Sequence, residues 1–311
     1  IVKVDDKVVA GVKMPQDSMI RLMKGPKGSK VKITVNRDGT LIPFEITRDK
    51  IPVNCVDAAF MIDSRTGYVK LSKFTRTTYK EFTEATQKLL AQGMTRLIFD
   101  LRDNTGGYFD QALLLSNEFL KRGEEIVYME GLNRPRQDYD ADGDGALKDV
   151  QISVLIDEGT ASSSEIFAGA IQDNDRGVIV GRRSFGKGLV QEPINFTDGS
   201  GVRITVARFH TPSGRCIQQP YEDTDYDYDI YDRYMSGEMT SADSMKVDTT
   251  ALYHTVGGRP VYGGGGIIPD VFVAMDTTRA TDFYIQANRK ATQMRFAQSM
   301  FDKYRGTLSQ I

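Results

Sequence analysis

The sequence predicts an α/β protein with a largely parallel, buried sheet, preceded by a smaller β-rich module. Two observations support this prediction. From Gly67 onward, short apolar strands alternate with helices, and such strands need crossover connections that make them parallel. Residues 1–48 instead alternate apolar with polar side chains between glycine-containing turns. A chain of 311 residues also exceeds the usual size of one domain, so a large core and a small module are expected.

Residues 1–48 are predicted to form the β-rich module. Residues 31–35 and 44–46 alternate as half-buried strands do, and Asp38-Gly39 marks a turn between them. Residues 16–24 place apolar side chains close to helical spacing, which predicts one short helix.

Residues 49–311 are predicted to form the core. Its strands are expected at 67–71, 96–101, 152–156 and 178–180. Its helices are expected at 78–92, at 109–122 and directly after the small residues 159–164. Residues 219–262 are rich in Tyr and Asp and poor in aliphatic side chains, so we interpret them as a surface insertion. A strand at 267–273 follows, and then a C-terminal helical segment, 276–311, whose helix is expected to run from residue 281 to residue 304.

Charge and composition argue against several classes of protein. The net charge is −2, with acidic and basic residues nearly balanced, which gives no electrostatic surface for nucleic acid. No apolar run approaches the roughly 20 residues of a membrane-spanning helix. Cys55 and Cys216 are too few for a disulfide framework, and their spacing indicates no metal site. Residues 1–7 read as a strand and turn already under way and begin without Met, so an upstream segment is expected.

Ser162 and Lys187 are the predicted nucleophile and general base. Ser162 lies in a run of small residues before an apolar helix, whose N-terminus offers unpaired N–H groups. A serine hydroxyl needs a neighbour that accepts its proton, and lysine serves where its surroundings favour the neutral amine. Lys187 lies between two glycines and near apolar residues, and Gln191 is predicted to hold its amine by a hydrogen bond.

An oxyanion needs preorganised donors, usually two backbone amides. We expect one from Ser163, directly after the nucleophile, and the other from Gly106 or Gly107, in a loop that follows a predicted parallel strand. His210 and His254 carry no local motif, so a structural or solvated role is expected for each and a triad with histidine is disfavoured.

Together these segments resemble the C-terminal processing peptidases, also called tail-specific proteases, from the first residue to about Val273 apart from the insertion. The similar segments are GTASSSEIFAGAIQDND (159–175), RRSFGKGLVQ (182–191), DLRDNTGG (100–107, with Thr105 where proline is usual), ARFHTPSGRCI (207–217) and GGIIPDV (265–271). The resemblance implies a fold like that of Clp protease and crotonase. It implies a serine endopeptidase that cuts proteins near their C-termini through an acyl-enzyme, with Ser162, Lys187 and Gln191 in the roles given above and no metal or organic cofactor.

In this family the β-rich module is a PDZ domain, and residues 1–48 resemble only its second half. The resemblance therefore implies that the loop that grips a peptide carboxylate lies upstream of this chain. It also implies protein substrates with exposed C-termini and a periplasmic or envelope location. Self-association stays open, as does a role of the insertion as a lid.

Two other functions are weighed against the peptidase. One is a scaffold in which a gated or inactive core presents peptide-binding surfaces. The other is an acyl-CoA enzyme of the crotonase kind, which would not need a lysine placed to deprotonate a serine. The joint presence of Ser162, Lys187 and Gln191 favours the peptidase. Asp140 to Gly145 match the first half of a calcium loop, but Gln151 stands where a bidentate Glu is required, so we interpret them as a solvated acidic turn.

Overall fold

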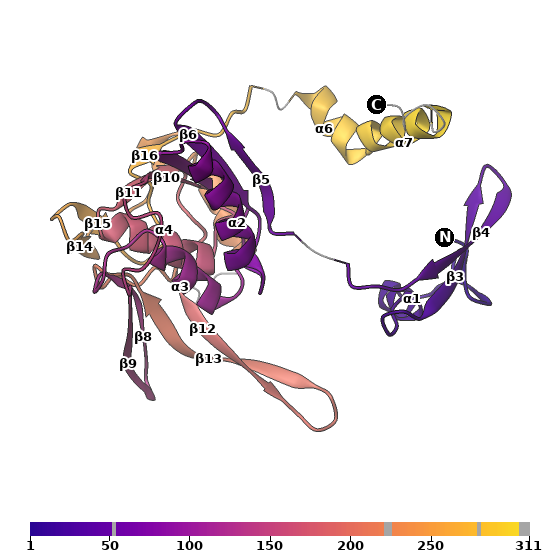
Figure 1. The fold of residues 1–311 in the computed structure, drawn as a ribbon, viewed down its shortest axis with the longest axis horizontal. Coiled ribbons are helices and arrows are strands. Elements are labelled where there is room, and N and C mark those ends of the chain that lie inside the picture. Colours follow the sequence, from indigo (N-terminus) through magenta and orange to yellow (C-terminus); the bar gives the residue numbers. More distant parts are fainter. Residues whose placement is uncertain (52–53, 221–225, 279–280, 305–311) are drawn as a thin grey trace. The chain divides into compact units, whose positions relative to one another are not determined.

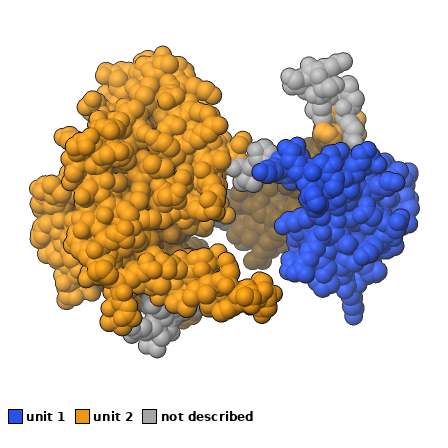
Figure 2. Space-filling model, turned by 60° about the horizontal axis from the view of Figure 1, so that its bottom comes forward, with its two compact units in different colours: residues 1–53 blue, residues 54–311 orange. Residues whose placement is uncertain are grey.

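Residues 1–51, 54–220, 226–278 and 281–304 are described by a computed structural model, in which the chain divides into two units (Figure 2). The units are Ile1–Val53 and Asn54–Ile311, so the division falls a few residues after the expected boundary at residue 48. No helix within the described ranges is both long and apolar enough to cross a membrane.

The first unit is an antiparallel sheet with one helix. Its strand order is β2-β1-β3-β4, and the bounds are β1 Lys3–Val4, β2 Lys7–Val8, β3 Lys30–Arg37, β4 Thr40–Thr47 and α1 Gln16–Met23. A small cluster of buried valines, Val4, Val9 and Val31, forms its core together with apolar residues of α1. The expected β-rich character is thus confirmed, while its assignment to a PDZ domain stays a prediction.

The second unit is built on a six-stranded sheet of order β16-β11-β10-β7-β6-β5, in which the five strands from β16 to β6 are parallel to their neighbours and β5 is antiparallel (Figure 1). The strand bounds are β5 Val56–Met61, β6 Thr66–Leu71, β7 Arg96–Asp100, β10 Gln151–Ile156, β11 Gly177–Gly181 and β16 Val271–Phe272. The helices α2 Thr78–Ala91, α3 Phe109–Asn117 and α4 Ser163–Asp173 connect successive strands and lie beside one another. The predicted α/β class is confirmed.

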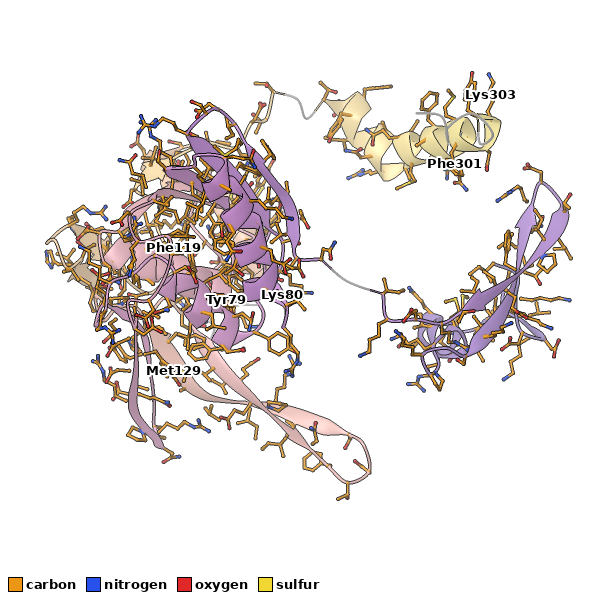
Figure 3. The ribbon with its side chains drawn as sticks, viewed as in Figure 1. Tyr79, Lys80, Phe119, Met129, Phe301 and Lys303 are labelled. Atoms are coloured by element: carbon orange, nitrogen blue, oxygen red, sulfur yellow. The ribbon has the colours of Figure 1, made fainter. Side chains whose placement is uncertain are left out.

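Four buried phenylalanine rings join α2, α3 and α4 to the sheet. Phe99 of β7 packs edge-on against Phe82 of α2 and Phe167 of α4, with ring centroids 5.1 and 5.0 Å apart. Phe119, just after α3, lies within the dense side-chain packing of Figure 3 and closes the cluster at 5.6 Å from Phe167. Every residue of α4 is buried, so this cluster fixes the helix that follows Ser162.

A second, antiparallel sheet of order β12-β13-β8-β9 extends from the core as two hairpins (Figure 1). The bounds are β8 Glu125–Gly131, β9 Arg134–Asp140, β12 Leu189–Asn195 and β13 Gly201–His210. The remaining elements are α5 Tyr226–Met235, the short 3₁₀ helix Ala242–Ser244, β14 Leu252–His254 and β15 Pro260–Tyr262. Because β12 begins two residues after Lys187, this hairpin continues directly from the predicted base.

Three predicted elements end differently from the sequence pattern. The helix expected at 109–122 ends at Asn117, because the Glu118 carbonyl and carboxylate accept hydrogen bonds from the amides of Leu147 and Ala146. The strand expected at 267–273 contains only Val271–Phe272. The final helix is two helices, α6 Asp282–Arg289 and α7 Thr292–Tyr304, separated at Ala291, whose φ of 49° cannot continue a right-handed helix.

The interpretation of residues 219–262 as a surface insertion is wrong for part of that segment. Six of its described residues are buried, namely Gln219, Arg233, Glu238, Met239, Thr255 and Val261. Composition did not reveal this because two of them are charged, and charged side chains are buried only where specific partners surround them. Residues 221–225 of this interpretation lie outside the described part.

The stability of the core can be tested on two adjacent leucines of α3. Leu115 has no exposed surface, whereas Leu114 is 40% exposed. We expect Leu115→Ala to lower the free energy of unfolding by about 2–5 kcal/mol and the melting temperature by roughly 5–15 °C, because it leaves a cavity. Leu114→Ala should change the melting temperature little. Calorimetry of both variants checks this, and equal effects would contradict the packing described above.

Candidate active site

Ser162 stands at the sharp junction between the strand β10 and the helix α4. Its backbone angles are φ 57° and ψ −116°, which a residue with a side chain rarely adopts. The Ser162 side chain is half-buried, whereas its neighbours Ser163 and Ser164 are buried. A serine on a strained strand-to-helix turn is the arrangement that presents a nucleophile at the edge of a sheet.

The loop after β7 holds this turn in place. The Asn104 carbonyl accepts hydrogen bonds from the Ala161 amide at 2.9 Å and from the Ser164 hydroxyl at 3.0 Å. The Ser163 hydroxyl donates to the Gly107 carbonyl at 3.1 Å. The structure therefore brings the loop predicted to supply an oxyanion donor directly against the predicted nucleophile.

Gly106 and Gly107 allow this close approach. Gly106 has a φ of +85°, and a methyl group added there would lie 2.6 Å from the Ala161 carbonyl oxygen and 2.9 Å from Ser162 Cβ. A methyl group on Gly107 would lie 1.9 Å from the Phe74 carbonyl oxygen. Both positions therefore exclude a side chain.

The three predicted oxyanion donors differ in their hydrogen bonds. The Gly106 amide donates to the Asn104 side-chain oxygen at 2.9 Å, so it is occupied. The amides of Ser163 and Gly107 donate to no acceptor within the described residues. Of the alternatives Gly106 and Gly107, the geometry favours Gly107 as the partner of Ser163.

A single buried carboxylate, that of Glu165, links the predicted nucleophile to the segment of the predicted base. Its Oε2 accepts the Ser162 amide at 2.7 Å and the Lys187 amide at 2.9 Å. Its Oε1 accepts the Ser184 hydroxyl at 2.5 Å and the Gly186 amide at 2.7 Å. Burial raises the pKa of the Glu165 carboxyl above its usual value, and the four donors oppose that shift. The backbone amides of Ser162 and Lys187 therefore share one acceptor oxygen.

Further hydrogen bonds fix the turn that carries Lys187. The Phe185 amide donates to the Thr160 carbonyl at 2.9 Å, and the Gly188 amide donates to the Gln218 side chain at 2.8 Å. The Lys187 side chain is half-buried. The main chain before Lys187 is thus hydrogen-bonded to Thr160, close to Ser162 in the chain, and the main chain after it is hydrogen-bonded to Gln218.

Gln191 is not placed as simply as the sequence pattern suggests. Lys187 precedes β12, and the strand has an irregularity between Val190 and Gln191 that disturbs the alternation of side chains. Gln191 is exposed, and no hydrogen bond joins it to Lys187 among the contacts of the described residues. Its role in orienting the lysine stays a prediction.

The two histidines differ in their surroundings. His210 stacks flat on Tyr128 with ring centroids 4.6 Å apart, and its Nδ1 lies 3.2 Å from the Gly214 carbonyl oxygen. His254 lies at the end of β14, opposite Pro260, and is exposed. A structural role for His210 and a solvated position for His254 agree with these surroundings.

The acidic turn at residues 140–145 is filled by protein groups. Lys148 Nζ donates to the Gly143 carbonyl, and Arg122 pairs with Asp144 at 3.1 Å. Asn117 donates to the Asp142 carboxylate at 2.8 Å. Within the described ranges no group of three or more His, Cys, Asp or Glu side chains could hold a metal ion.

Sequence reasoning missed Glu165 and Asn104 as parts of this site. A signal for Glu165 was present, since Ser-x-x-Glu before an apolar run is the pattern of a capping box at a helix start. That pattern predicts the bond to the Ser162 amide. It says nothing of Ser184, Gly186 and Lys187, which come from a later strand connection.

The fold and site define an α/β protein of the serine-hydrolase class, with a serine at a strained helix entry beside two unpaired amides. Residues 65–230 match the model of peptidase family S41, and these residues contain both Ser162 and Lys187. The chain belongs to peptidase family S41, a family of serine-type peptidases.

Similar proteins have names that agree with this family. The carboxyl-terminal-processing protease of Synechocystis sp. is 39% identical over 209 residues, which are 65% of this chain and 48% of that protein. The carboxy-terminal processing protease CtpA of Bacillus subtilis is 36% identical over 220 residues, 70% of this chain and 46% of that protein. The solved structure of a photosystem II D1 C-terminal processing protease matches with a TM-score of 0.51 and 29% identity, over 88% of this chain and 62% of that one. The chain thus spans about half the length of the two curated relatives.

The role of Glu165 can be tested with Glu165→Gln. An amide has only one acceptor oxygen, so two of the four donors would face an NH₂ group. We expect a fluorophosphonate probe to phosphonylate Ser162, with loss of fluoride, about ten- to a hundredfold more slowly, because buried donors lose their partners. The matched control is Glu118→Gln, since Glu118 is buried too and accepts from Tyr79 at 2.7 Å and from Ala146 at 2.9 Å. Equal rates of reaction with the probe in Glu165→Gln and Glu118→Gln would refute the role of Glu165.

The close approach at Gly106 gives a second test. Gly106→Ala and Gly123→Ala carry a similar left-handed strain of about 1–2 kcal/mol, because their φ angles are +85° and +82°. Only the methyl group at Gly106 would collide with Ser162, since that at Gly123 has nothing within 4 Å. We expect Gly106→Ala to slow the reaction of Ser162 with the fluorophosphonate probe by about a hundredfold, and Gly123→Ala to leave that rate unchanged. A rate for Gly106→Ala within twofold of that for Gly123→Ala would contradict the geometry.

Proposed function

We propose that this chain is a serine endopeptidase that cleaves proteins near their C-termini through a Ser162–Lys187 dyad. The single observation that supports the dyad is that one oxygen of Glu165 accepts the backbone amides of both residues, at 2.7 and 2.9 Å. A shared acceptor keeps the two main-chain segments adjacent. This adjacency of the two main-chain segments supports the assignment of the lysine as the base for the serine.

The reaction proceeds in two halves. Ser162 Oγ attacks the substrate carbonyl carbon while the neutral Lys187 amine takes the hydroxyl proton. The resulting oxyanion accepts hydrogen bonds from the backbone amides of Ser163 and Gly107. The C–N bond then breaks as Lys187 returns the proton to the leaving amine, which leaves an acyl-enzyme on Ser162. Water attacks this ester with Lys187 again as base, the C–O bond to Ser162 breaks as Lys187 returns the proton to Ser162 Oγ, and the acid product leaves. Gln191 orients the lysine amine in this scheme.

The remainder of the proposal concerns the whole protein. Its substrates are proteins with exposed C-termini. The names of the two curated relatives, which describe processing at the carboxyl terminus by those proteins, support this. The unit Ile1–Val53 acts as part of a PDZ domain, and the protein works outside the cytoplasm, as the family resemblance implies. The alternative is a scaffold with an inactive core.

The decisive experiment measures cleavage of an unstructured protein with an apolar C-terminus. We expect Ser162→Ala and Lys187→Ala to lower the rate by at least about a thousandfold, since each removes a reacting group. Lys246→Ala is the control, because its side chain is exposed and, among the described residues, forms an ion pair with Asp232 alone, at 3.6 Å. Hydrolysis that survives both Ser162→Ala and Lys187→Ala would overturn the proposal.

A longer version, extended upstream to a complete PDZ domain, is tested in the same assay. If only the longer version cleaves the substrate, the added segment is required for activity. If neither version cleaves it, the scaffold is favoured.

A further inference from the structure

The segment expected to be a surface insertion contains a buried cluster of charges. Glu238, 3% exposed, accepts two hydrogen bonds from Arg183, at 2.8 and 2.6 Å, and one from Arg233 at 2.9 Å. Arg233 is also 3% exposed, and Asp229, one helical turn before it in α5, lies 3.9 Å away and adds a second negative charge. The two arginines are thus matched by two carboxylates.

Arg233 also binds the main chain that leads to the predicted base. Its Nη2 donates to the Arg183 carbonyl at 2.7 Å, and its Nη1 donates to the Ser184 carbonyl at 3.1 Å. The hydroxyl of the same Ser184 donates to Glu165, which accepts the amides of Ser162 and Lys187. A continuous chain of hydrogen bonds therefore runs from α5 to both members of the dyad.

The far side of the same turn is held by residues 218 and 219, at the start of this segment. The Gln219 amide donates to the Gly186 carbonyl at 3.0 Å, and the Gln218 side chain accepts the Gly188 amide at 2.8 Å. The turn 184–188 is thus gripped at its beginning by Arg233 and further along by residues 218 and 219. Neither grip uses the substrate-facing amides of Ser163 and Gly107.

Stability alone does not account for this cluster. Burying charged groups carries a desolvation penalty, and apolar side chains of similar volume often stabilise a core as well or better. A guanidinium, however, offers several donors in fixed directions, which an apolar side chain cannot replace at two carbonyl oxygens. Its geometry therefore suits a role in holding the turn in one position.

We propose that Arg233 and Glu238 are positioning residues that keep the turn 184–188, and with it Lys187, aligned with Ser162. This inference rests on the proposed function, in which Lys187 is the base. Arg233 acts through the Ser184 main chain, and Glu238 acts by fixing the Arg233 and Arg183 side chains. The former insertion is then a support of the active site rather than a surface addition.

The test uses the full chain with Arg233→Lys, Glu238→Gln and the control Asp232→Asn. Asp232 is next to Arg233 in α5, but its side chain is 59% exposed, and its one ion pair within the described ranges is with Lys246. Hydrogen exchange of peptides covering 182–190 and 159–166 is compared with that of β7. We expect exchange about tenfold faster at the two site peptides in the first two variants, with β7 unchanged. Asp232→Asn should match the parent chain.

Kinetics give the second readout. We expect kcat to fall about ten- to a hundredfold while KM changes less than about threefold, because substrate contacts remain and the alignment of the base is lost. Folded Arg233→Lys and Glu238→Gln variants with unchanged exchange at 182–190 would overturn the inference. So would faster exchange that is equal in β7, since that reports a general loss of stability.

The failure of this inference is distinguishable from that of the proposed function. If Ser162→Ala still cleaves substrate, the dyad itself is wrong. If Ser162→Ala is inactive but the Arg233 and Glu238 variants exchange and turn over like the parent chain, only the positioning role is wrong. Hydrogen exchange decides the matter even where cleavage is not detected, because it needs no substrate.

Discussion

The active site depends on one buried carboxylate. Glu165 lies inside the protein with no exposed surface, and it accepts hydrogen bonds from three backbone amides and one hydroxyl. Two of these donors are the amides of the residues proposed to react, and the other two are the Ser184 hydroxyl and the Gly186 amide, in the turn that leads to Lys187. A buried charge is tolerable only with such a set of partners. The fold therefore has one arrangement of these segments that satisfies Glu165.

The rest of the second unit supports the position of that carboxylate. The helix α4 carries Glu165 in its first turn, and four phenylalanine rings pack this helix against β7 and its neighbours. The loop after β7 presses Asn104 and Gly106 against the strained Ser162. Strain at a functional residue persists only where its surroundings determine the backbone, and here contacts from two loops do so.

The lysine side of the site depends on contacts from much later in the chain. Gln218 and Gln219 bind the turn that carries Lys187. The Arg233 guanidinium binds the carbonyl groups of Ser184, at the start of that turn, and of Arg183, just before it. The turn of the proposed nucleophile is thus fixed by a loop that comes earlier in the chain, and the turn of the proposed base by residues that come later. Both turns depend on partners that are distant in sequence.

The sequence by itself determined the α/β alternation and the strand and helix around Ser162, because hydrophobic periodicity and small-residue turns are local signals. Only the tertiary structure decided which groups meet. The Gly106 amide binds the Asn104 side chain, whereas the Gly107 amide has no acceptor among the described residues. Arg233 and Glu238 are buried, and α3 ends at Asn117, where Glu118 accepts hydrogen bonds from residues 146 and 147. The physical reason is that these choices satisfy buried polar groups across long sequence separations, which no local pattern records.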